Sequence, residues 1–110
     1  KGTTALLAAI LATAESLGVC EALAEQWNRD NPGFAEATDL RVRRVTAKAW
    51  RFVGEMEEIA ATFRAAGLPG EFHVAAADVY RRLAHFKDSP ATPALADVLA
   101  ALLQAESKLG

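Results

Sequence analysis

Residues 51–70 read RFVGEMEEIAATFRAAGLPG, and this stretch indicates how the chain folds. Its apolar side chains recur at spacings of three and four, the period of an α-helix with one buried face. They are Phe52, Val53, Met56, Ile59, Ala60 and Phe63. The segment 67–70, GLPG, then ends the helix, because glycine favours the left-handed C-terminal cap and proline cannot continue a helix. The stretch therefore predicts an amphipathic helix followed by a sharp turn.

The same helical period extends over most of the chain on both sides of this stretch. Helices are predicted over residues 3–17, 19–28, 34–66 with a break near 46–49, 72–86, and from 92 towards the end of the chain. In the last of them Thr92 is the expected N-cap and Pro93 the first helical residue. The sequence shows no period-two pattern of a β-strand. It therefore predicts an all-α fold, an irregular bundle of five to six helices, with Trp27, Trp50 and Tyr80 in its core.

Length and composition limit the class of protein. The 110 residues correspond to one domain, and 52% of them are hydrophobic, which excludes a disordered tail. The 14 acidic residues outnumber the 12 basic ones, so nucleic acid is not an expected partner. Cys20 is the only cysteine, which rules out an internal disulfide and a cysteine-rich zinc site. No uncharged apolar run approaches the roughly 20 residues that span a bilayer, so no membrane partner is expected.

The first predicted helix is apolar on almost every side. Between Lys1 and Gly18 its only charged residue is Glu15, whereas a surface helix of a globular domain normally carries one polar face. We therefore expect another subunit or another domain to cover part of this helix. Helix-forming residues begin at Thr3 with no stop signal before them, so we also expect this sequence to be the C-terminal part of a longer protein.

Four basic residues, Arg41, Arg44, Lys48 and Arg51, follow one another at spacings of 3, 4 and 3. In an unbroken helix they would share one face, and neighbouring cations repel each other unless negative charge lies close by. One interpretation is a site for a phosphate or carboxylate ligand. The other is a solvated helix face whose cations pair with acidic neighbours, such as Glu55 four residues after Arg51.

Glu55, Glu57 and Glu58 form an acidic cluster, with Glu55 and Glu58 on one helical face. Two such carboxylates can bind a divalent metal ion or share a proton, but no histidine stands at a metal-ligand spacing beside them. A solvated helix face is therefore the expected outcome, and no metal site is predicted. The sequence has no G-x-G-x-x-G, Walker, H-E-x-x-H or EF-hand motif, so we expect this chain alone to bind no cofactor.

Two stretches resemble a known family. One is KGTTALL at residues 1–7, with its continuation to LGV at 17–19, and the other is RFVGEMEEIA at 51–60, with AGLP at 66–69. Together they resemble the C-terminal helical domain of 6-phosphogluconate dehydrogenase-like oxidoreductases, in the β-hydroxyacid dehydrogenase superfamily. The nearest branch is one whose C-terminal domain is catalogued as a domain of unknown function. The resemblance extends from Lys1 to about Leu95.

The resemblance implies a cytoplasmic, two-domain enzyme that transfers hydride between a small anionic hydroxyacid and NAD or NADP. An N-terminal Rossmann domain, which is not part of this sequence, would bind the cofactor. Residues 1–110 would form the helical domain that closes the substrate site and builds a homodimer. The acid/base lysine of such enzymes would lie upstream of Lys1, about two helical turns away, so no catalytic residue is expected in this chain.

Four residues of this chain are the candidates for contact with the substrate: Lys1, Arg51, Glu55 and Glu58. The resemblance places Lys1 on the same helix as the catalytic lysine, in the position where the true 6-phosphogluconate enzymes carry a tyrosine that contacts substrate. Lys1 and Arg51 would bind the substrate anion. Glu55 and Glu58 would orient it or form hydrogen bonds with it.

One run departs from the family pattern. In the common β-hydroxyacid dehydrogenases a methionine is followed shortly by a lysine–aspartate pair near the cofactor, whereas this chain reads Met56-Glu57-Glu58. Glu57 reverses the charge, so no family contact is carried over to it, and the substrate can differ from 6-phosphogluconate and from short hydroxyacids. The alternative class is a non-enzymatic helical interaction module. A strand followed by G-x-G-x-x-G upstream of Lys1 would favour the enzyme.

Overall fold

The computed structural model describes residues 1–109, and it describes side chains for residues 1–104. Residues 1–109 form six α-helices, two short 3-10 helices and no strand, which confirms the all-α prediction. The elements are α1 (Gly2–Leu17), α2 (Cys20–Asp30), α3 (Phe34–Val45), η1 (Thr46–Lys48), α4 (Ala49–Ala65), α5 (Glu71–Arg82), η2 (Ala84–Phe86) and α6 (Leu95–Leu109). Within the described residues, no helix combines the length and the apolar character that crossing a bilayer requires.

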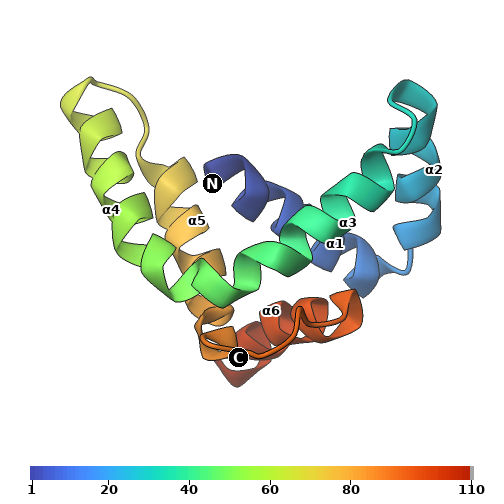
Figure 1. Ribbon diagram of the computed structural model, residues 1–110. Helices are drawn as coiled ribbons and strands as arrows, with labels where there is room; N and C mark the ends of the chain where they lie inside the picture. Colours follow the sequence, from blue (N-terminus) through green and yellow to red (C-terminus); the bar gives the residue numbers. More distant parts are fainter. Residues whose placement is uncertain (110) are drawn as a thin grey trace.

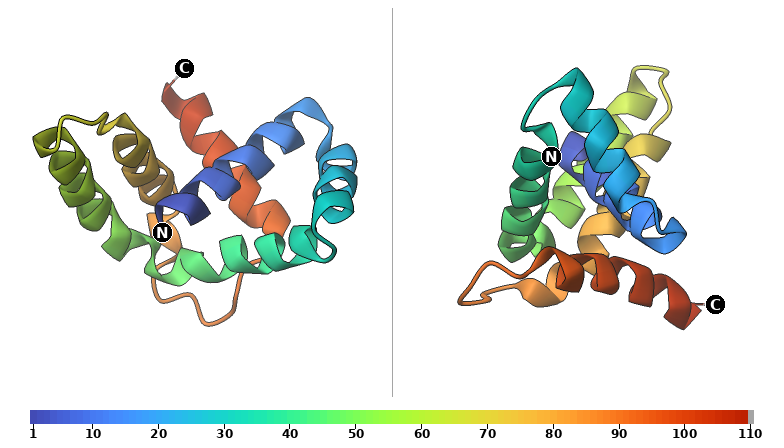
Figure 2. Two further views of the ribbon diagram at one scale, coloured as in Figure 1. Left: turned by 90° about the horizontal axis from the view of Figure 1, so that it is seen from above. Right: turned by 90° about the vertical axis from the view of Figure 1, so that its right-hand side faces the viewer.

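Helix α1 lies at the centre of the bundle (Figure 1). It packs against α2, α3, α5 and α6, so the helix that the sequence marks as apolar on nearly all sides contacts most of the fold. The α4–α5 hairpin lies beside the start of α1 and α2 lies at its other end, while α6 crosses beneath (Figures 1 and 2). Helix α3 runs across the bundle and continues through η1 into α4.

The core combines a few large side chains with many alanines. The large side chains that are fully buried are Tyr80, Met56, Leu83, Val42 and Val98. Eight alanines of α1, α4 and α5 are also buried: Ala5, Ala8, Ala12, Ala14, Ala49, Ala60, Ala76 and Ala77. Alanine favours the helix and lets backbones approach closely, but each one removes little apolar area from water, at about 25 cal/mol per Å².

The predicted helix ends are confirmed in the first two thirds of the chain. Gly18 ends α1 with a φ of 71°, in the left-handed region where glycine carries no steric cost. The break expected near residues 46–49 is η1. Gly67 follows α4 with a φ of 83°.

Three predictions about the later part of the chain and the core are wrong. The helix expected over 72–86 ends at Arg82, because Leu83 leaves helical geometry with φ −100° and ψ 0° and a separate 3-10 turn follows. The final helix does not begin at Thr92 and Pro93, because its first backbone N–H groups donate to the carbonyl of Ala94. Trp50 is 42% exposed instead of buried.

Local contacts explain two of these differences. The carbonyl of Pro93 accepts a hydrogen bond of 2.9 Å from Nε of Arg43, so this segment is held against α3 before α6 begins. Trp50 lies outside the core, with the Lys87 ammonium 4.2 Å from its ring centroid, a geometry in which the cation stabilises the exposed aromatic face.

A close contact between α4 and α5 depends on Gly70, which directly precedes α5. A Cβ atom at this position would lie 2.7 Å from the carbonyl oxygen of Ala60 and 2.9 Å from Nε of Arg64. The backbone oxygen cannot move away without shifting α4. Gly54, in the middle of α4, has no atom within 4 Å of the corresponding Cβ position.

We predict that Gly70→Ala lowers the free energy of unfolding by about 1–3 kcal/mol, the usual range for overpacking a close contact. The matched variant Gly54→Ala should raise it by about 0.5–1 kcal/mol, because alanine replaces glycine in an open helical position. Urea unfolding followed by circular dichroism measures both. Equal effects of the two substitutions would show that α4 and α5 do not approach each other at Gly70.

Candidate functional site

The first turn of α1 is fixed to α5 by a buried tyrosine. The hydroxyl of Tyr80 donates a hydrogen bond to the backbone carbonyl of Lys1, which also accepts the helical bond from the N–H of Ala5 at 3.1 Å. The ring of Tyr80 is fully buried and packs edge-on against Phe52, with 5.4 Å between the ring centroids. One side chain of α5 therefore sets the position of Lys1 relative to α4.

A second close contact holds the same turn. A Cβ atom on Gly2 would lie 2.9 Å from Nε2 of His73, and the His73 ring packs edge-on against Phe63 at 4.7 Å. Nδ1 of His73 is buried and has no hydrogen-bond partner among the described residues. Glycine at position 2 lets α1 lie directly against this histidine.

The side chain of Lys1 meets one of the other candidate residues. Its ammonium lies 2.7 Å from Oε1 of Glu55 and 4.7 Å from the ring centroid of Phe52. The Lys1 and Glu55 side chains are 46% and 40% exposed, so water screens the pair and its net contribution to stability is about 0–1 kcal/mol. Lys1 and Glu55, which are 54 residues apart in the chain, thus lie together at the start of α1.

The other two candidates lie apart from this pair. Arg51 and Glu58 are exposed on α4, and their side chains form no hydrogen bond or ion pair with any described residue. The predicted pair between Arg51 and Glu55 is not formed, because Glu55 contacts Lys1 instead. The structure therefore assembles two of the four candidate residues and leaves Arg51 and Glu58 open to solvent.

Two of the three glutamates in the acidic cluster form ion pairs, each with a different basic residue. Glu55 pairs with Lys1, whereas Oε2 of Glu57 lies 3.6 Å from Nη2 of Arg81 on α5. In the part of the chain that the structure describes, no three His, Cys, Asp or Glu side chains are grouped as metal ligands. Glu55 and Glu57 thus act in separate ion pairs, and Glu58 forms none with the described residues.

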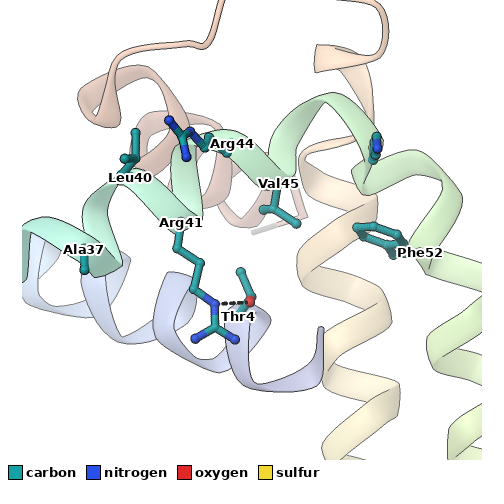
Figure 3. A pocket seen from close by; sticks show the side chains of 8 residues that line it. Thr4, Ala37, Leu40, Arg41, Arg44, Val45 and Phe52 are labelled. Carbon is teal, nitrogen blue, oxygen red and sulfur yellow. Dashed lines mark hydrogen bonds between the residues drawn. The ribbon is translucent and has the colours of Figure 1, made fainter. Parts of the chain in front are cut away.

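Beside the Lys1–Glu55 pair, helices α1, α3 and α4 line a hollow of about 490 Å³ that is open to solvent (Figure 3). Phe52 belongs to both features, since it lines the hollow and lies under the Lys1 ammonium. The residues that line the hollow are Thr4, Ala37, Leu40, Arg41, Arg44, Val45, Lys48 and Phe52. Three of the four residues in the basic row are among them. Arg51 is not, because the 3-10 turn η1 changes the helical phase before α4 begins.

One hydrogen bond connects the two sides of this hollow. Nε of Arg41 on α3 donates to Oγ1 of Thr4 on α1 at 2.7 Å, and the Thr4 side chain is buried (Figure 3). Sequence reasoning did not single out Thr4, Phe52 or Tyr80 for this region. Each occupies an ordinary position in an amphipathic helix, and no local pattern indicates its long-range partner.

The chain belongs to the family described as "Domain of unknown function (DUF1932)", whose model matches residues 14–83. The match covers the end of α1 and all of α2 to α5, including the Phe52 and Tyr80 positions. It confirms the expectation of a domain catalogued as a domain of unknown function, and it includes the stretch at residues 51–60. No curated protein and no solved structure gave a significant match to the chain.

The surroundings of Tyr80 change its acidity. Burial of the ring and hydroxyl raises the pKa of Tyr80 from 10.0 to about 12, because the low-dielectric interior disfavours the phenolate. The positive charge of Arg41 lowers this pKa and the negative charge of Glu55 raises it, so both neighbours act on the same hydroxyl. The pKa of Tyr80 is higher in the folded chain than in the unfolded chain. As the pH rises, the unfolded chain therefore loses this proton before the folded chain does. Stability is therefore intact below about pH 10 and falls as the pH rises towards 12.

We predict that Tyr80→Phe removes this alkaline sensitivity. Near neutral pH the variant should be less stable by about 0.5–1.5 kcal/mol, because the Lys1 carbonyl loses a hydrogen bond. Between about pH 10 and 12 the unmodified chain should lose up to about 1.4 kcal/mol per pH unit more than the variant. Urea unfolding at several alkaline pH values measures the difference. Parallel stability curves for the two proteins would mean that the hydroxyl is not held as described.

Proposed function

We propose that this chain is the C-terminal helical domain of an NAD(P)-dependent, hydroxyacid-type dehydrogenase related to 6-phosphogluconate dehydrogenase. The observation that carries the proposal is the family match over residues 14–83, which agrees with the branch indicated by the two sequence stretches. In the proposed protein a Rossmann domain precedes Lys1, and a helix that contains the catalytic lysine continues into α1. The protein would work in the cytoplasm.

The geometry at the start of α1 suits this role. Lys1 would face the interdomain site, and its ammonium would bind the carboxylate of a small hydroxyacid. Glu55 lies 2.7 Å from that ammonium and would orient it, while Phe52 beneath it would exclude water from one side. Arg51 and Glu58 have no partner among the described residues, so both side chains are available to a ligand or to the preceding domain.

The cofactor would belong to the preceding domain. A dinucleotide site of the Rossmann type needs a strand, a glycine-rich turn and a helix, and residues 1–109 contain no strand. Residues 1–109 therefore do not form a dinucleotide site of this type. When bound to the other domain, the nicotinamide would exchange hydride with the hydroxyacid carbon, and the residues of this chain would bind the anion and close the site.

The exposed apolar surface supports a homodimer in the same proposal. Leu6 on α1 is 60% exposed and Phe72 on α5 is 72% exposed, and both line one groove between these helices. A second apolar groove, between α1 and α2, again includes Leu6, together with Leu17. Covering such side chains with a second subunit removes them from water. The same surface is what a non-enzymatic helical interaction module would use, which is the alternative function.

We predict that in the longer protein, which includes the Rossmann domain, Lys1→Ala and Arg51→Ala each lower kcat/KM by about 10-fold or more. A contact between a cation and a charged substrate away from water contributes about 1.5–3 kcal/mol. Arg29→Ala is the matched control, because Arg29 is an exposed cation of α2 remote from Lys1. If either Lys1→Ala or Arg51→Ala stays within about twofold of the unmodified enzyme, that residue does not contact the substrate.

We also predict that the longer protein is a homodimer in solution and that Leu6→Glu combined with Phe72→Glu converts it to a monomer. A charge on each side chain would have to be buried in the interface without a partner. Light scattering at micromolar concentration measures the mass. Leu68→Glu is the control, since Leu68 is 57% exposed but lies in the turn after α4. A monomeric mass for the unmodified protein contradicts the dimer.

A further inference from the structure

The hollow between α1, α3 and α4 carries a strong excess of positive charge. Arg41, Arg44 and Lys48 are three of its eight lining residues, and none of the eight is acidic. The chain as a whole has a net charge of −2, so this concentration of cations is local. Like charges that line one hollow repel each other, and an anion bound in the hollow lowers their electrostatic energy.

The three cations of the hollow have no acidic partner among the described side chains, and the same is true of Arg29, Arg43, Arg51 and Lys87. Lys1, Arg64, Arg81 and Arg82 each lie within 4.0 Å of a carboxylate oxygen. Among the side chains of residues 1–104, none is paired in this way with Arg41, Arg44 or Lys48. The charge of the hollow is thus not neutralised within the described chain.

Arg41 is oriented for an anion before any ligand arrives. Its Nε is held by the buried hydroxyl of Thr4 at 2.7 Å, while its two terminal nitrogens donate to no described residue. The planar guanidinium can therefore present both terminal N–H groups to one carboxylate or phosphate, which is the arrangement that favours arginine over lysine at such sites.

The rest of the lining is apolar. Ala37, Leu40 and Val45 contribute from α3 and Phe52 from α4, and Figure 3 shows Phe52 across the hollow from the Arg41 guanidinium. The volume of about 490 Å³ lies within the range of roughly 300–1,000 Å³ that is common for small-molecule sites. A ligand that fills this space would place a charged group near the arginines and an apolar group against Phe52.

We propose that this hollow is a binding site for a small organic anion, in which a carboxylate or phosphate group is attached to an apolar body. Arg41 would bind the charged group, Arg44 and Lys48 would add positive charge around the hollow, and Phe52 with the aliphatic lining would bind the body. The site is separate from the Lys1–Glu55 pair, although the two share Phe52. It does not depend on the dehydrogenase proposal, because it follows from charge, shape and orientation in this chain alone.

The test is a titration of the 110-residue chain with phenylacetate and with the neutral phenylacetamide, followed by NMR chemical shifts. Phenylacetate should give saturable shifts at Thr4, Arg41 and Phe52, and phenylacetamide should bind at least about 10-fold more weakly. Arg41→Gln should raise the dissociation constant for phenylacetate by about 10-fold or more. Arg29→Gln removes the same charge outside the hollow and should change it less than about twofold.

Two further variants separate binding from folding. Arg44→Gln changes a side chain that forms no hydrogen bond in the described structure, so the fold should remain and phenylacetate binding should weaken. Thr4→Val keeps the size of the side chain but releases Nε of Arg41, and should weaken binding by about three- to 10-fold. Circular dichroism of each variant checks the fold.

Three results would overturn the proposal. They are the absence of saturable shifts with phenylacetate up to about 10 mM, equal binding of phenylacetamide, and an equal effect of Arg29→Gln and Arg41→Gln. Enzymatic activity of the longer protein does not enter this measurement. Failure of the binding site therefore leaves the dehydrogenase proposal standing, and the absence of dehydrogenase activity leaves the binding site standing.

Discussion

The position of the first turn of α1 depends on one buried hydrogen bond, from the hydroxyl of Tyr80 to the carbonyl of Lys1. The exposed Lys1–Glu55 pair alone is too weak to fix this turn, since such pairs contribute about 0–1 kcal/mol. Tyr80 also packs against Phe52, which lies under the Lys1 ammonium and lines the neighbouring hollow. The Lys1–Glu55 pair and the hollow both depend on where Tyr80 places α1.

The alanine-rich core explains how the helices of the bundle come so close together and why apolar surface remains uncovered. Buried alanines such as Ala8 and Ala77 let α1 and α5 approach, and Gly70 does the same for α4 and α5. Small side chains remove little apolar area from water, and the larger Leu6 and Phe72 remain exposed outside the core. A chain built in this way gains stability from a second surface, whether that surface is another subunit or another domain.

The sequence predicted most of the fold because local signals determine it. Helical spacing, the glycines at 18 and 67 and the break before residue 49 all depend on neighbouring residues. The start of α6 could not be predicted from neighbouring residues, because Arg43, 50 residues earlier, donates a hydrogen bond to the carbonyl of Pro93.

The candidate site was predicted in part. Spacing revealed the basic row and the family resemblance indicated Lys1 and Glu55, but Thr4–Arg41 and Tyr80–Lys1 join segments 37 and 79 residues apart and leave no local pattern.

The proposed activity belongs to a longer protein, and one assay examines it directly. The protein that includes the segment before Lys1 is mixed with NAD or NADP and a series of small hydroxyacids, and formation of the reduced nicotinamide is followed by its absorbance. The 110-residue chain alone is the control. The dehydrogenase assignment predicts that the longer protein reduces one of the two cofactors with at least one hydroxyacid while the chain alone reduces neither. If the folded longer protein binds neither cofactor and forms no reduced nicotinamide with any hydroxyacid, the assignment is contradicted.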